Sequence, residues 1–206
     1  MYAEDGFTVL KGGFIMETYK NLKKGTKIGL IITAVLLAAV LVAGVFGAVQ
    51  AFNAGRTTTA IFTMADVVMC VLILLYAFFG YKKPHGNLLK LIFFVFAVYL
   101  ALQGMLNIAG QSSYAVGSMC VLAALLIAYV AGRLNKIEKN KFILIFVGLL
   151  ILARVIILFV TGPVSSGSLS IFACMTSMTS FITFAALSFA YIARYEQHKA
   201  AGLEDK

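Results

Sequence analysis

The chain has 206 residues, of which 62% are hydrophobic and only 12% are charged, and its formal net charge is +9. A soluble domain carries roughly 25% charged residues, so this composition excludes a water-soluble globular domain. With 18 glycines and two prolines, it instead predicts a single all-α membrane domain, because small residues allow close packing of helices in lipid.

Six apolar stretches follow one another along the chain. Each has the roughly 20 residues that a helix needs to cross about 30 Å of hydrocarbon. Strands are excluded because membrane strands alternate apolar and polar residues, whereas these stretches are apolar throughout. The expected spans are 28–50, 60–80, 90–109, 114–132, 142–162 and 168–193.

The Lys and Arg residues are distributed unevenly around these spans. All of the 17 except Arg56 and Arg154 lie before the first span, between the second and third, between the fourth and fifth, or after the sixth. The positive-inside rule makes this side cytoplasmic. We therefore expect a cytoplasmic N-terminal segment at 1–27, a six-helix transmembrane domain at 28–193 and a cytoplasmic tail at 194–206, in the plasma membrane. The basic residues are scattered over short loops, a pattern that does not indicate nucleic-acid binding.

The beginning of the chain has two features of processing signals. A basic flank and the stretch Val49-Gln50-Ala51 are typical of a signal peptide. The apolar run is longer than the 7–15 residues of a signal core, so an uncleaved anchor is expected. Met16 is a second candidate start, which would make residues 1–15 an upstream extension.

The connections on the outer side are short, at about 53–59, 110–113 and 162–167. Short links favour antiparallel neighbours, so the six spans are expected to form three antiparallel hairpins. The sequence Met-Cys-Val-Leu occurs at 69–72 and again at 119–122. This repetition is either chance or the trace of a pseudo-threefold bundle with the odd-numbered spans at its centre.

The first span carries small residues at helical spacing, Ala39, Ala43 and Gly47. Such a strip allows close helix packing, either against another span of this chain or against another membrane subunit. In size, six spans and a small-residue first helix, the chain resembles the substrate-binding subunits of energy-coupling-factor transporters, in which an Ala-xxx-Ala first helix meets a partner. The resemblance covers the architecture only, and the chain lacks the tryptophans and long outer loops that would complete it.

Apart from Lys90 at the first residue of the third span, only two charged residues lie inside the expected spans, Asp66 in the second and Arg154 in the fifth. An isolated charge in hydrocarbon costs several kcal/mol, so both side chains are expected to face protein or water. Counted from the outer ends of their spans at 1.5 Å per residue, both lie at a depth of about 10–12 Å. The sequence thus places the two charges at one level in the outer half of the membrane.

Other polar side chains are expected at this level. Gln103 in the third span lies there, with Asn107 and Tyr99 one turn to either side on the same helix face. The sixth span adds Ser170, Cys174 and Ser177 on one face, with Thr176, Thr179, Ser180 and Thr183 close by. Of these, Thr176 and Ser177 are the expected binding residues.

Three interpretations of this polar layer remain open. Asp66 and Arg154 form a pair that locks the bundle, or the layer lines an outward-facing pocket for a small polar or zwitterionic solute, or Asp66 relays protons. In the pocket, the carboxylate would take a cationic group, the guanidinium an anionic group, and Gln103 and Asn107 would fix the orientation.

Catalytic residues are not expected. His85 and His198 lie outside the spans, and no span has a carboxylate pair or a serine near a base, so an enzyme is excluded. The three cysteines and the internal methionines lie in the outer half and suit Cu(I), but Cys-x-x-Cys spacing is absent and such residues commonly fill helix contacts. No metal or cofactor is expected.

The sequence therefore predicts a small transport or solute-binding membrane protein. The alternative is a non-catalytic scaffold or regulatory subunit of a larger membrane complex. The expected partners are membrane lipids, a small polar solute and, through the first span, another membrane subunit.

Overall fold

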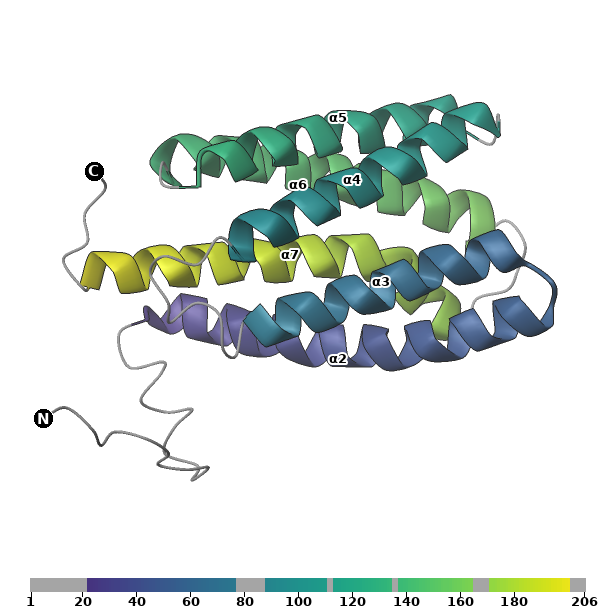
Figure 1. Cartoon of the computed structure of the whole chain (residues 1–206), viewed down its shortest axis with the longest axis horizontal. Coiled ribbons are helices and arrows are strands. Elements are labelled where there is room, and N and C mark those ends of the chain that lie inside the picture. Colours follow the sequence, from purple (N-terminus) through teal and green to yellow (C-terminus); the bar gives the residue numbers. More distant parts are fainter. Residues whose placement is uncertain (1–21, 77–87, 111–112, 135–136, 165–170, 201–206) are drawn as a thin grey trace, which may run out of the picture.

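The computed structural model describes residues 22–76, 88–110, 113–134, 137–164 and 171–200 (Figure 1). The side chains of 137–139, 162–163, 171–177, 198 and 200 are not among the described ones. The helices are α2 (Lys24–Asn53), α3 (Thr57–Leu75), α4 (Leu88–Ala109), α5 (Tyr114–Gly132), α6 (Ile137–Phe159), which continues into a π-helical turn (Val160–Val164), and α7 (Ile171–Ala200).

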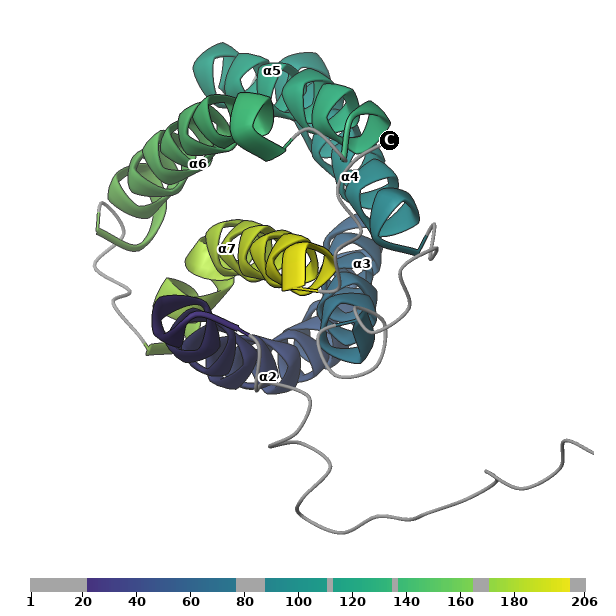
Figure 2. The same ribbon diagram turned by 90° about the vertical axis from the view of Figure 1, so that its left-hand side faces the viewer.

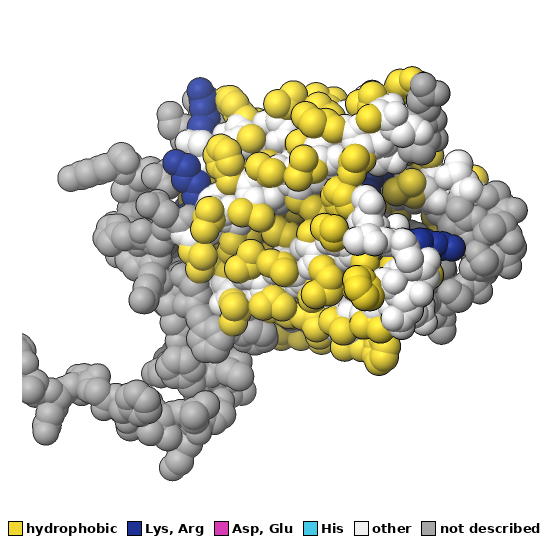
Figure 3. Space-filling view, turned by 45° about the vertical axis from the view of Figure 1, so that its right-hand side comes forward, with side chains coloured by type: hydrophobic (Ala, Val, Ile, Leu, Met, Phe, Trp, Pro, Cys, Tyr) yellow, Lys and Arg dark blue, Asp and Glu magenta, His cyan; other side chains and the backbone are white. Residues whose placement is uncertain are grey.

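Five of these helices, α2 to α6, are long and apolar enough to cross a membrane. The predicted all-α membrane bundle is therefore confirmed at this level. Hydrophobic side chains cover most of the face seen in Figure 3, and Lys and Arg side chains show mainly near its two ends. Lipid replaces water around such a surface, so large apolar side chains remain exposed, among them Ile31, Phe46 and Phe142.

The last helix, α7, lies inside a ring formed by the other five (Figure 2). It packs against α2 and α6 and, less extensively, against α3. The closest pairs in the ring are α4 with α5 and α2 with α3. This arrangement does not match a pseudo-threefold bundle with odd-numbered spans at its centre, because the central helix is the sixth.

The sequence of α7 explains its central place. Thr179, Ser180 and Thr183 are all buried, and hydroxyl groups are costly against lipid unless they find partners in the protein. The apolar side chains of α7 also point into the core, where the Phe184 ring stacks with Phe96 of α4 at 6.5 Å between centroids. A helix surrounded by other helices can thus be less apolar than those that face lipid.

The beginning of α2 and the end of α7 are joined by hydrogen bonds. The Lys23 backbone N–H donates to Glu196 Oε2 at 2.8 Å, and Thr26 Oγ1 donates to Glu196 Oε1 at 2.9 Å. Lys23 provides no side-chain cap for α2, so Glu196 supplies the cap that the helix N-terminus needs. Glu196 lies in the part of α7 that continues to Ala200, beyond the expected span.

Candidate functional site

The polar layer is a chain of hydrogen bonds that crosses four helices. Asp66 of α3 is hydrogen-bonded to the Tyr99 hydroxyl of α4. Gln103 of α4 donates its Nε2 proton to the same hydroxyl. Its other amide atom, Oε1, accepts from Arg154 Nη2 of α6 at 2.5 Å, and Arg154 Nη1 donates to Ser180 Oγ of α7 at 2.8 Å. Of the expected site residues, Asp66, Tyr99, Gln103 and Arg154 are therefore in one network.

Arg154 is a buried member of this chain of hydrogen bonds. Only 7% of its surface is exposed, and its Nε atom is buried without a hydrogen-bond partner among the described residues. Its hydrogen-bond partners among the described residues, Gln103 and Ser180, are neutral. The Asp66 carboxylate attracts the guanidinium electrostatically, and the hydrogen bonds connect the two charges through Tyr99 and Gln103.

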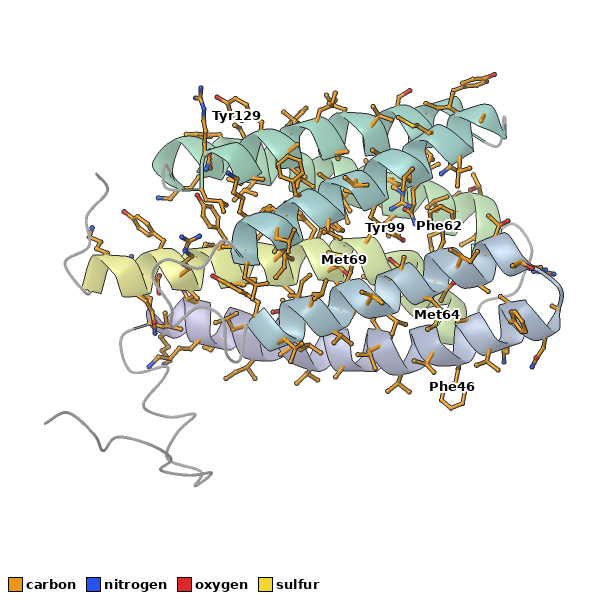
Figure 4. All side chains as sticks on the ribbon, in the orientation of Figure 1. Phe46, Phe62, Met64, Met69, Tyr99 and Tyr129 are labelled. Atoms are coloured by element: carbon orange, nitrogen blue, oxygen red, sulfur yellow. The ribbon has the colours of Figure 1, made fainter. Side chains whose placement is uncertain are left out.

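Tyr99 is held in place by aromatic contacts on two sides. Its ring lies 6.3 Å from Phe62 of α3 and is stacked with Phe96 of α4 at 6.5 Å, both between centroids. Tyr99 and Phe62 lie next to each other between α4 and α3 in Figure 4. Since α3 and α4 make few other contacts, this aromatic contact and the Tyr99–Asp66 hydrogen bond connect the two helices at the level of the polar layer.

The remaining expected binding residues differ in their placement. The Asn107 amide donates to the Gln103 backbone carbonyl of its own helix at 2.8 Å, and its side chain is partly buried. The side chains of Thr176 and Ser177 lie outside the described residues. Ser180, which the sequence places near the layer but not among the expected binding residues, is the hydroxyl that Arg154 contacts.

A second polar contact within the bundle lies about one helical turn from the layer, between α3 and α7. The sulfur of Cys70 is 4.0 Å from Thr183 Oγ1 of α7, and Cys70 and Cys120 are buried free cysteines. Within the described part of the chain, no three His, Cys, Asp or Glu side chains gather where they could hold a metal ion.

The small residues of the first span lie at different exposures. Ala43 is buried, whereas Ala39 and Gly47 are partly exposed. The closest approach in this region is at Gly44, where an added Cβ would lie 2.8 Å from Val67 Cγ2 of α3. The strip around Ala43 and Gly44 therefore faces a neighbouring helix of the same chain.

A backbone-to-backbone helix contact, which the sequence analysis missed, joins α4 and α5. A Cβ added to Gly104 would lie 2.8 Å from the carbonyl oxygen of Gly117, and one added to Gly117 would lie 2.8 Å from that of Gly104. The two glycines allow the backbones to meet. Single glycines without a small-xxx-small repeat gave no signal of this contact in the sequence.

Chemically, the layer combines an anionic group, a cationic group and an amide at one depth. A buried guanidinium with neutral partners and a spare N–H is suited to an anionic group, which binds more strongly than a neutral acceptor. The Asp66 carboxylate is suited to a cation. No family model, curated protein or solved structure matches this chain in the comparisons with known proteins.

Proposed function

We propose that the chain is a plasma-membrane protein of six spans, arranged as three antiparallel hairpins with both ends in the cytoplasm, that binds or transports a small polar or zwitterionic solute from the outer side. Five apolar helices and the distribution of Lys and Arg support the topology. The observation that carries the solute proposal is Arg154, a buried cation in the outer half whose hydrogen bonds go to neutral groups.

The binding step is an exchange of partners at Arg154. A carboxylate of the solute accepts from the guanidinium in place of Gln103 or Ser180, and the spare Nε–H provides a second donor for a bidentate contact. The new hydrogen bond to the charged carboxylate stabilises more than the lost bond to the neutral acceptor did, because charge-assisted hydrogen bonds are roughly twice as strong. The amine of the same solute faces Asp66, and the Gln103 side-chain amide rotates to lie between the solute's carboxylate and its amine.

A thermal-shift screen of the purified protein against amino acids and other small zwitterions tests this proposal. A solute at 100 times its dissociation constant stabilises the folded state by about 2.7 kcal/mol. We expect Arg154→Gln to lose this ligand-induced stabilisation and Arg56→Gln, at the exposed turn before α3, to retain it. Equal stabilisation of Arg154→Gln by the solute would contradict the proposal.

The second candidate is a scaffold or regulatory subunit, favoured by the fact that protein groups already hydrogen-bond Arg154. A double-mutant cycle with Asp66→Asn and Arg154→Gln separates the two functions. In a scaffold, each single substitution costs about 3–5 kcal/mol, the figure for a broken buried pair, and the double substitution recovers much of it. In a solute-binding protein, the double variant is no more stable than the single ones and the ligand effect disappears in all three.

A further inference from the structure

A groove runs between α6 and α7 in the half of the molecule that holds the basic ends of the helices. Its volume is about 500 Å³, within the range of roughly 300–1,000 Å³ typical of small-molecule sites. Its deep walls are apolar and are formed mainly by Leu144, Ile145, Phe181, Phe184 and Ile192. It is distinct from the polar layer, because neither Asp66 nor Arg154 lines it.

The groove has the length and the access that an acyl chain needs. From Glu196 at its mouth to Phe181 at its far end, α7 advances about 22 Å at 1.5 Å per residue. That exceeds half of the roughly 30 Å hydrocarbon thickness. Helices α2 and α6 flank α7 from two sides and hardly contact each other (Figure 2), so the neighbouring lipid has lateral access to α7. Gly148 of α6 has no side chain to fill the space beside Phe184. A Cβ added to Gly148 would lie 3.3 Å from the Phe184 ring.

The mouth of the groove is positively charged. Lys23 and Lys141 line it, and both side chains are exposed. The carboxylate of Glu196, also at the mouth, is already occupied by the Lys23 backbone N–H and Thr26. Neither lysine side chain forms an ion pair with another described residue, so their ammonium groups are available to an anion at the membrane surface.

We propose that this groove binds an anionic phospholipid of the leaflet on the basic side, with one acyl chain between α6 and α7 and the phosphate between Lys23 and Lys141. Charge complementarity selects the headgroup, and the apolar walls hold the chain. A neutral phospholipid has the same acyl chains and lacks the net negative charge, so it fills the groove without the contribution of the two lysines.

Lipid titration of the full-length protein in detergent, followed by native mass spectrometry, tests the proposal. The probes are phosphatidylglycerol and phosphatidylcholine with identical acyl chains. We expect phosphatidylglycerol to bind at least tenfold more tightly to the wild-type protein. Each lysine accounts for about fivefold of the affinity, the effect of one basic residue at an anionic surface. The double variant Lys23→Gln, Lys141→Gln therefore loses about 25-fold for phosphatidylglycerol and changes little for phosphatidylcholine.

Two further variants make the test independent of folding defects. Lys90→Gln removes an exposed lysine from α4, away from the groove, and should leave both affinities unchanged. Ile145→Trp fills the groove from its exposed side, since Ile145 is 62% exposed, and should weaken both lipids. Equal binding of the two lipids by the wild-type protein, an equal loss in Lys90→Gln, or unchanged binding in Ile145→Trp would overturn the proposal. A protein dimer that forms without bound lipid and is abolished by Ile145→Trp would also overturn it, since a second copy would then occupy the groove.

Discussion

Among single residues, Tyr99 is central to the hydrogen-bond network, because its hydroxyl connects Asp66 of α3 to Gln103 of α4. It is hydrogen-bonded to Asp66 on one side and accepts from Gln103 on the other. Removing the hydroxyl group therefore deprives the Asp66 carboxylate of its donor and the Gln103 Nε2 group of its acceptor in a poorly solvated place.

We expect Tyr99→Phe to lower the free energy of unfolding by about 1–3 kcal/mol, the cost of leaving buried polar groups unsatisfied. The matched control is Tyr129→Phe, because Tyr129 is 46% exposed on α5 and should change stability by no more than about 0.5 kcal/mol. Melting temperatures of the two variants in the same detergent provide the measurement. Equal melting temperatures would show that the hydroxyl of Tyr99 is solvated and that the chain of hydrogen bonds is not structural.

Some of the residues that form this hydrogen-bond network could be predicted from the sequence. Asp66, Gln103 and Arg154 could be found because charged and amide side chains in apolar spans must turn inward and all three lie at one depth. The contact of Arg154 with Ser180 could not be found, since it depends on how α7 is rotated about its axis. The Asn107 amide bonds to its own helix, a local competition that helical spacing alone does not reveal.

At the scale of the elements, the glycine pair of α4 and α5 shows what fixes the distance between two helices. Gly104 and Gly117 each face the carbonyl oxygen of the other, so a side chain on either one has to push a backbone in addition to the neighbouring side chain, Val121 or Ile108. Apolar runs predicted that these helices exist, but they contain no information on which faces meet.

We expect Gly117→Ala to destabilise the protein by about 1–3 kcal/mol, the usual cost of overpacking a tight contact. Gly132→Ala, at the end of the same helix, is the matched control, because nothing lies within 4 Å of its added Cβ. The control should be neutral or stabilising by up to about 1 kcal/mol, since alanine favours the helix over glycine. Thermal unfolding of both variants decides the question, and an undiminished stability of Gly117→Ala would mean that α4 and α5 can separate at no cost.

At the scale of the whole molecule, the central place of α7 was not predicted from the sequence. The many Ser and Thr residues of α7 fit that place, because α7 packs against protein on several sides and its hydroxyls have protein partners such as Arg154 and Cys70.

The proposed topology predicts which residues outside reagents can reach. Single cysteines placed at 82–90 and 133–141, in a background without the native cysteines, should be protected from a membrane-impermeant thiol reagent in intact cells. Cysteines at 53–58 and 163–167 should react, and Gly55 and Arg56 in the first of these ranges are exposed. Permeabilised cells serve as the control, in which both groups should react. Reaction of both groups in intact cells would contradict the six-span topology.

The position of α7 also has a consequence for biogenesis. The ribosome delivers the chain from its N-terminus, so α2 to α6 enter the bilayer before the helix around which they are arranged exists. Arg154 must then be accommodated in α6 with Gln103 as the partner already synthesised, and Ser180 reaches it only later. The cap that Glu196 places on the first described helix is likewise added by the last one. In the proposed topology, insertion of α7 is therefore the step that closes the bundle, because α2 can pair with α3 and α4 with α5 before α7 packs against α2, α3 and α6.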